Sequence, residues 1–134
     1  MRLLLGSGGL RGEERQRVYF EEMARHFKGC EEIVFIPYAA NNHAQYTSRI
    51  RDFSAPSGIN IRGIETFADP IQAIEEAEGL YVGGGNTFLL TKILHENNLI
   101  EVVRNRVSQG MPYMGVSAGS NVACPTMQTT NDMP

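Results

Sequence analysis

Short apolar runs that alternate with helical patterns constrain the fold of this 134-residue chain more than any other feature. The run at 33–36 is continuously apolar, without the polar alternation of a half-exposed strand, which is typical of a strand covered on both faces. Strands that alternate regularly with helices predict a parallel sheet with right-handed crossovers and helices on both faces. We therefore expect an α/β fold with strands at about 2–5, 33–36, 59–64, 79–82 and 111–114.

Helical patterns fill the segments between these strands, at about 13–27, 42–53, 69–77, 87–95 and 99–107. In the first helix, Val18, Met23 and Phe27 are expected to face the core. Asp69 followed by Pro70 is typical of a helix start, with the aspartate as N-cap and the proline at the first helical position. In such sheets the functional groups gather where the carboxyl ends of strands meet helix starts.

The composition is that of an ordinary globular protein, with 42% hydrophobic and 20% charged residues. A chain of this length is expected to form a single α/β domain over residues 1–134 and to bury about two thirds of its unfolded surface. The net charge of -3 gives no basic footprint for nucleic acid or for an anionic membrane. The sequence shows neither an apolar run of membrane-spanning length nor a signal-peptide pattern, so we expect a cytoplasmic protein.

The two cysteines, Cys30 and Cys124, lie far apart and form no C-x-x-C spacing. Their number and spacing suggest neither a disulfide framework nor a zinc site. Each is expected to be a small buried hydrophobic residue, and no metal site is predicted.

Residues 115–119 read Gly-Val-Ser-Ala-Gly and lie between an apolar strand and a helix start. That is the setting of the G-x-S-x-G elbow, a sharp turn that presents the serine hydroxyl to solvent. Ser117 would then be a nucleophile, and the N–H of Ala118 would lie where a developing oxyanion could be stabilised. The same pattern occurs by chance, so an ordinary strand-to-helix turn whose small residues permit close packing is the alternative.

Three consecutive glycines, residues 83–85, follow the fourth predicted strand. Glycine permits positive φ and close backbone approach, and ordering three in succession is entropically costly. An oxyanion hole usually needs a second N–H besides the one that follows the nucleophile, and Gly84 or Gly85 could supply it. A tight turn without a functional role is the alternative.

Four segments together resemble peptidase E, the α-aspartyl dipeptidase family, over nearly the whole chain. They are Phe-Ile-Pro-Tyr-Ala at 35–39, Val-Gly-Gly-Gly-Asn-Thr-Phe at 82–88, the segment 115–125 and Thr-Thr-Asn-Asp-Met-Pro at 129–134. The resemblance implies a flavodoxin-like sheet related to class I glutamine amidotransferases, with serine where those enzymes carry cysteine. It also implies a small dipeptide with an N-terminal aspartate as substrate, hydrolysed without a metal or other cofactor.

By this resemblance Ser117 is the nucleophile, and Asp132 is the acidic member of the catalytic set. Gly84, Gly85 and Ala118 border the oxyanion. Taken without the resemblance, the Asn-Asp pair that ends in Asp132 is typical of a turn.

The general base is the main departure from the family pattern. The resemblance places the catalytic histidine after the acidic residue, whereas His26, His43 and His95 all precede Ser117. His26 and His95 lie near expected helix C-termini, where histidine commonly interacts with the helix dipole. Only His43, at a helix start, is a candidate for the site. We therefore expect the chain to be the N-terminal portion of a longer hydrolase domain and to be nearly inactive by itself.

Two other functions fit parts of the sequence. A catalytically inactive fragment, or a regulatory or binding domain that keeps the fold, would explain the missing downstream histidine, and an incomplete sheet would favour a homo-oligomer or another partner chain. Nucleotide binding through residues 6–12 is the other alternative. A dinucleotide fingerprint that begins at Gly6 and Gly8 requires glycine at position 11, where Arg11 stands.

Overall fold

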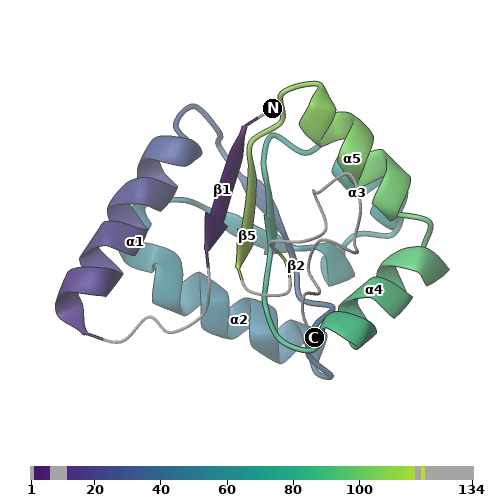
Figure 1. Ribbon diagram of the computed structural model, residues 1–134, viewed down its shortest axis with the longest axis horizontal. Helices are drawn as coiled ribbons and strands as arrows, with labels where there is room; N and C mark the ends of the chain where they lie inside the picture. Colours follow the sequence, from purple (N-terminus) through teal and green to yellow (C-terminus); the bar gives the residue numbers. More distant parts are fainter. Residues whose placement is uncertain (1, 7–11, 117–118, 120–134) are drawn as a thin grey trace.

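A parallel sheet runs through the middle of the molecule, with helices on both sides (Figure 1). The computed structural model describes residues 2–6, 12–116 and 119 of the chain. Its strands are β1 (Leu3–Gly6), β2 (Ile33–Ile36), β3 (Ile61–Gly63), β4 (Leu80–Val82) and β5 (Tyr113–Val116). They lie in the order β1-β5-β4-β2-β3, and every neighbouring pair is parallel. The predicted α/β fold is confirmed.

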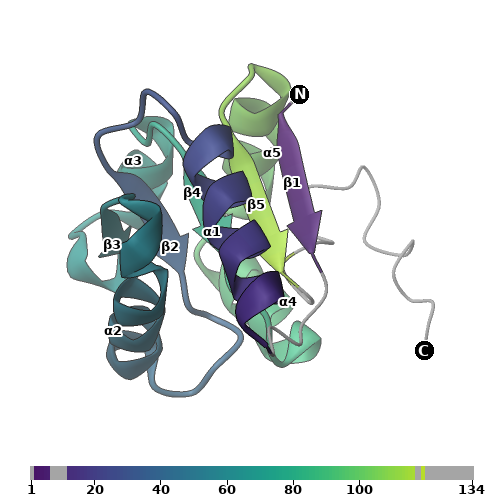
Figure 2. The same cartoon turned by 90° about the vertical axis from the view of Figure 1, so that its left-hand side faces the viewer.

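The helices divide into two layers, as Figures 1 and 2 show. They are α1 (Glu13–His26), α2 (His43–Ser54), α3 (Pro70–Glu75), α4 (Thr87–Glu96) and α5 (Ile100–Ser108), with short 3-10 helices at Ala55–Ser57 and Ile64–Thr66. The first two α-helices cover one face of the sheet, and the other three cover the opposite face. Asp69 caps α3 through its side chain, which accepts from the N–H groups of Ile71 and Gln72, as the sequence predicts.

Both faces of the central strands are buried, which explains why the apolar runs do not alternate. In β2, Val34 packs toward α3, α4 and α5, whereas Phe35 packs toward α1 and α2. The same division separates Leu80 from Tyr81 in β4. Because successive side chains of a strand point to opposite faces, a strand covered on both sides needs apolar residues at every position.

Two strands begin two residues later than predicted, whereas β1 and β4 differ from their predicted bounds by one residue. The fifth strand begins at Tyr113, two residues later than expected, and continues to Val116. The third is only Ile61–Gly63, because Ile64 begins a 3-10 helix that turns the chain away from the sheet. An edge strand of this kind forms hydrogen bonds along one side only, so its length depends on local turn geometry.

The expected core position of Val18 is wrong. Its side chain is 45% exposed, whereas Met23 and Phe27 are fully buried as predicted. The stripe that faces the sheet passes instead through Tyr19, which lies four residues before Met23 and eight before Phe27. That spacing keeps the three side chains on one helical face, and Val18 falls beside it.

The chain reverses its direction of travel across the sheet between β2 and β4. From β2 it passes through α2 to β3 on one side, and α3 then returns it to β4 on the other side of β2. Neighbouring strands whose connections leave in opposite directions form a crevice at their carboxyl ends, where ligands of open α/β sheets bind.

Candidate active site at the carboxyl edge of the sheet

The carboxyl ends of β2, β4 and β5 lie side by side. Ile36 is paired with Val82, and Val82 is paired in turn with Gly115. The glycine loop that follows Val82 and the G-x-S-x-G segment that includes Gly115 therefore start from adjacent positions. The topology brings together the two segments from which the sequence predicts an oxyanion hole and a nucleophile.

The loop formed by residues 83–86 is held by hydrogen bonds from three sides. The N–H of Gly83 donates to Ile36 O over 3.1 Å, and the N–H of Asn86 donates to Ala39 O over 3.0 Å. The Tyr46 hydroxyl donates to the carbonyl oxygen of Gly84 over 2.8 Å. These contacts connect the loop to the end of β2, to the segment that follows β2 and to α2, so its backbone has defined partners.

Two of the three glycines are required by the local geometry. Gly85 has φ 142°, a conformation that side chains disfavour, and a Cβ there would lie 2.7 Å from Ala39 O. At Gly83 a Cβ would lie 2.6 Å from the Tyr46 hydroxyl oxygen. The close approach and positive φ that the glycine run predicts are thus present.

The flanks of the serine elbow are placed, but its centre lies outside the described residues. Ser117 and Ala118 belong to that undescribed part, as does Asp132. Val116 ends β5 and is paired with Gly6 at the end of β1. Gly119 is buried, and its carbonyl oxygen accepts a hydrogen bond of 2.5 Å from the Tyr113 hydroxyl.

The histidines lie in different parts of the fold. His26 is the last residue of α1, and its Nε2 lies 2.9 Å from the carbonyl oxygen of Tyr113, at the amino end of β5. Burial lowers the pKa of His26, the nearby Arg2 charge adds to that effect, and the Tyr113 carbonyl opposes it. His95 lies in the last turn of α4. Their expected positions near helix C-termini are confirmed.

His43 lies on the carboxyl side of the sheet, where α2 begins. It begins α2, behind the Asn42 N-cap, and its ring centroid is 5.2 Å from that of Tyr38. Tyr38 lies two residues after the end of β2, on the carboxyl side of the sheet. The role of His43 as a candidate base stays a prediction.

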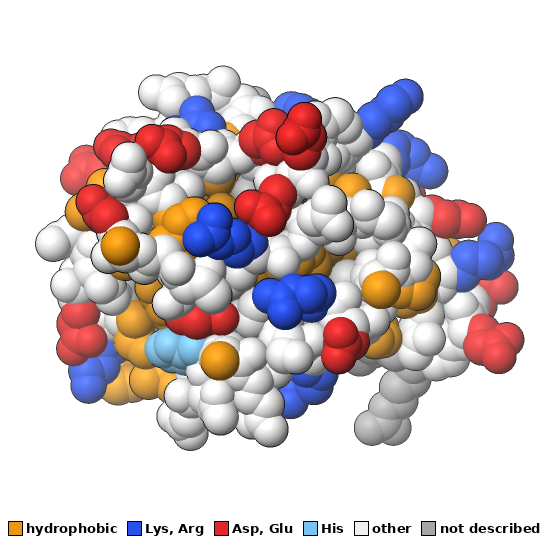
Figure 3. All heavy atoms as spheres, turned by 180° about the vertical axis from the view of Figure 1, so that it is seen from behind, with side chains coloured by type: hydrophobic (Ala, Val, Ile, Leu, Met, Phe, Trp, Pro, Cys, Tyr) orange, Lys and Arg blue, Asp and Glu red, His pale blue; other side chains and the backbone are white. Residues whose placement is uncertain are grey.

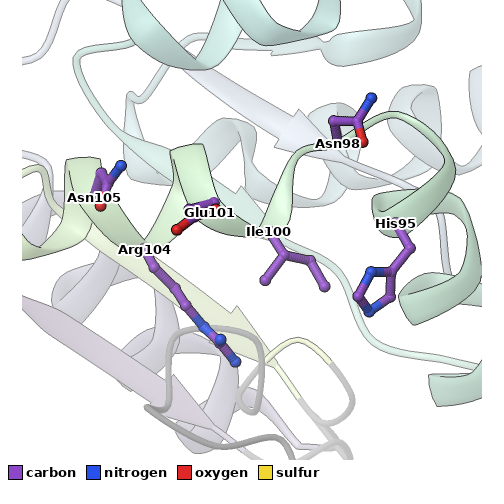
Figure 4. Close-up of a pocket in the computed structure, with 6 residues that line it drawn as sticks. All are labelled: His95, Asn98, Ile100, Glu101, Arg104 and Asn105. Carbon is purple, nitrogen blue, oxygen red and sulfur yellow. The ribbon is translucent and has the colours of Figure 1, made fainter.

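A hollow of about 550 Å³ lies against α4 and α5 (Figure 4). His95 and Arg104 project into it from the two helices. Its described lining consists of His95, Asn98, Ile100, Glu101, Arg104 and Asn105, which include no hydroxyl or thiol. This hollow therefore offers no alternative serine-type or cysteine-type nucleophile among its described residues.

Charges are mixed on one face of the molecule. On the face shown in Figure 3, acidic and basic side chains are interspersed and not gathered by sign. Within residues 2–6, 12–116 and 119, no three acidic, histidine or cysteine side chains are grouped as metal ligands. No described helix is both long and apolar enough to cross a membrane.

Tyr46 and Tyr113 are the site-supporting residues that sequence reasoning missed. Tyr46 contacts a loop 38 residues away, and the Tyr113 hydroxyl donates to the carbonyl oxygen of Gly119, six residues further along the chain. No local pattern marks either contact, since a tyrosine in a helix or at a strand start usually only fills the core. Neither tyrosine was singled out as a site residue by the four segments that resemble peptidase E.

Comparison with solved structures agrees with the fold. The crystal structure of a "Putative Peptidase E Protein" from Listeria monocytogenes EGD-e superposes with a TM-score of 0.68 at 22% identity, covering 98% of this chain and 65% of that one. A peptidase from an acI-B1 Actinobacterium gives a TM-score of 0.64 at 16% identity, over 89% and 55% of the two chains. At these identities the likeness shows the fold alone.

Curated relatives are closer in sequence. A "Probable alpha-aspartyl dipeptidase" of Drosophila melanogaster is 44% identical over 138 residues, which cover 98% of this chain and 56% of the fly protein. Peptidase E of Salmonella paratyphi A is 45% identical over 134 residues, 98% of this chain and 58% of the bacterial protein. The chain thus spans somewhat more than half the length of these relatives. Because the model of Peptidase family S51 matches residues 2–134, the chain belongs to that family.

Proposed function

We propose that this chain carries the nucleophile of a serine-type dipeptidase that hydrolyses dipeptides with an N-terminal aspartate. Family membership and the names of the curated relatives support this activity. The observation that carries the proposal is the meeting of the glycine loop and the flanks of the G-x-S-x-G segment at one edge of the sheet. That arrangement is what a nucleophile elbow with a backbone oxyanion hole requires.

Each proposed residue has a chemical role. The Ser117 hydroxyl oxygen attacks the peptide carbonyl carbon, while a base takes its proton. The N–H groups of Gly84, Gly85 and Ala118 stabilise the negative oxygen of the tetrahedral intermediate. Collapse of this intermediate breaks the C–N bond, the C-terminal amino acid leaves with a proton from the base, and water then hydrolyses the aspartyl ester. Asp132 orients the protonated base.

The base is proposed to be a histidine. The chain's own histidines differ in how they lie relative to the glycine loop. His26 is bonded to Tyr113 O at the amino edge of the sheet, away from the glycine loop. His43 lies on the carboxyl side, next to Tyr38. A histidine that follows the acidic residue in the polypeptide, as the family pattern implies, is the other source. Replacement of His43 separates these two sources.

The test measures hydrolysis of Asp-Leu and Leu-Leu by the whole polypeptide in which this chain occurs. We expect cleavage of Asp-Leu only, and a loss on the order of 10⁴-fold or more in Ser117→Ala. The His43→Gln variant is expected to retain activity if the base comes from the later histidine. Unchanged hydrolysis in Ser117→Ala would refute the assignment. Absence of all hydrolysis would favour a regulatory or binding domain.

We propose that the reaction takes place in the cytoplasm. Among the described residues Cys30 forms no disulfide, and its half-buried thiol donates to Glu78 O over 3.4 Å, which suits a reducing compartment. Its partial exposure differs from the fully buried position expected from the sequence. Cell fractionation followed by detection of the polypeptide tests the compartment.

A further inference from the structure

We propose that the Tyr46 hydroxyl is a positioning group that fixes the direction of the Gly85 N–H in the oxyanion hole. This inference rests on the proposed function, because it assumes that the glycine loop binds the oxyanion. It adds a residue from α2, a helix to which the serine, acid and glycine motifs assign no part in the reaction.

The contact acts through one peptide unit. Tyr46 Oη donates to the carbonyl oxygen of Gly84 over 2.8 Å. That carbonyl shares a planar peptide with the N–H of Gly85, and in a trans peptide the two groups point in opposite directions. Holding the Gly84 oxygen toward α2 therefore directs the Gly85 N–H away from α2.

The Gly85 N–H has the properties of a donor kept for a ligand. Gly85 is exposed, and within residues 2–6, 12–116 and 119 no acceptor is bonded to its N–H. The neighbouring donor differs, since the N–H of Asn86 is already bonded to Ala39 O. The peptide between Gly84 and Gly85 thus has its carbonyl anchored and its N–H open.

The Tyr46 ring is held so that its hydroxyl can reach the loop. The ring of Phe35 meets it edge to face at 5.2 Å, and the guanidinium of Arg49 lies 5.0 Å from its centroid. Burial raises the pKa of Tyr46, so the hydroxyl keeps its proton and remains a donor at neutral pH.

Gly83 makes room for this contact. A Cβ at that position would lie 2.6 Å from Tyr46 Oη and would displace the hydroxyl from the loop. The lack of a side chain at Gly83 therefore allows the Tyr46 hydroxyl to reach the loop. Without the tyrosine anchor, the Gly84 peptide has little to stop its rotation, because neither flanking glycine restricts its torsions. A rotated peptide would turn the Gly85 donor away from the developing charge, which lowers kcat more than it affects substrate binding.

The test compares Tyr46→Phe with Tyr81→Phe in the whole polypeptide. Each variant removes one phenolic hydroxyl from the same aromatic cluster and keeps the ring. The Tyr81 hydroxyl bonds to Tyr19 Oη at 2.7 Å, and no glycine of the loop is among its described hydrogen-bond partners. For Asp-Leu hydrolysis, we expect kcat to fall about 10-fold to 100-fold in Tyr46→Phe with KM within twofold. Tyr81→Phe should change kcat by less than twofold.

Gly83→Ala serves as a second variant should Tyr46→Phe fold poorly, because it displaces the hydroxyl without removing it. The same selective loss of kcat is expected, with folding checked by circular dichroism. An unchanged kcat in folded Tyr46→Phe or Gly83→Ala overturns the inference, as does an equal loss in Tyr81→Phe. If Ser117→Ala is inactive while Tyr46→Phe is unaffected, only this inference fails. If Ser117→Ala keeps full activity, the proposed function fails with it.

Discussion

The backbone of Gly119 lies directly against the carbonyl oxygen of Val82, with no space for a Cβ between them. Val82 is the last residue of β4, immediately before the glycine loop. The final glycine of the G-x-S-x-G segment is therefore packed onto the strand that presents the proposed oxyanion donors. This contact ties the two halves of the candidate site together without any side chain.

Replacement of Gly119 by alanine is expected to destabilise the protein by about 2 kcal/mol or more, since the new methyl group would overlap backbone atoms of β4. Urea unfolding measures the change. Gly6→Ala is the matched control, because a Cβ there meets nothing within 4 Å. Equal free energies of unfolding for the two variants would contradict the packing described.

The Gly85→Ala variant is expected to lose most of its dipeptidase activity. Its φ of 142° is strained for alanine, and the methyl group would lie 2.7 Å from Ala39 O, so the loop must move. A loss of about 100-fold or more in kcat follows if the Gly85 donor is displaced. Gly110→Ala carries comparable backbone strain, with φ 105° and open space around the Cβ, and should keep its kcat. Similar activities in the two variants would argue against the loop's role.

Three buried hydroxyls form a small network between α1, α2 and β4. Tyr19 Oη lies 2.7 Å from Tyr81 Oη and 3.2 Å from Ser54 Oγ. Tyr19→Phe would leave both partners without this bond, and we expect a loss of about 1 to 3 kcal/mol in the free energy of unfolding. Tyr81→Phe leaves the bond between Tyr19 and Ser54 in place and should cost less. Thermal or urea unfolding compares the stability lost in the two variants. A larger loss in Tyr81→Phe than in Tyr19→Phe would contradict a network centred on Tyr19.

Stability is expected to fall in mild acid through His26. Because burial lowers the pKa of His26 below its ordinary 6.5, the unfolded chain binds this proton more readily than the folded one. The contribution of neutral His26 to the free energy of unfolding is present in full above pH 6.5, and it is lost as the pH falls through that value toward the lowered pKa. His26→Gln keeps a donor for Tyr113 O and cannot titrate, so its stability should depend less on pH between 5 and 7. An NMR titration that gives His26 a pKa at or above 6.5 would contradict this prediction.

The sheet and its helices could be predicted from sequence because each strand carries a local signal. Ile33–Ile36 is bounded as expected, since a strand buried on both faces must be apolar throughout and Pro37 follows it. The bounds of β3 and the exposure of Val18 could not be predicted from sequence. The length of an edge strand and the rotation of a helix about its axis both depend on contacts with distant segments of the chain. Helix periodicity alone does not distinguish Val18 from Tyr19 as the core residue.

The candidate site was predictable only where backbone geometry dictates the residue. Gly85 and Gly119 are glycines for steric reasons, and such positions leave a mark in the sequence. Tyr46 leaves none, because its contact with Gly84 depends on how α2 packs across 38 residues of chain. The roles of Ser117, Ala118 and Asp132 stay predictions that biochemical measurement must decide.

Covalent labelling with a fluorophosphonate, followed by mass spectrometric mapping, shows whether Ser117 is the nucleophile. We expect one phosphonyl adduct on the peptide that contains Ser117, formed by the whole polypeptide and absent from Ser117→Ala. We also expect slower labelling in Gly85→Ala, because the same donors stabilise the charge that develops on the phosphonyl oxygen. An adduct on another residue, or equal labelling of Ser117→Ala, would contradict the assignment of Ser117 as the nucleophile.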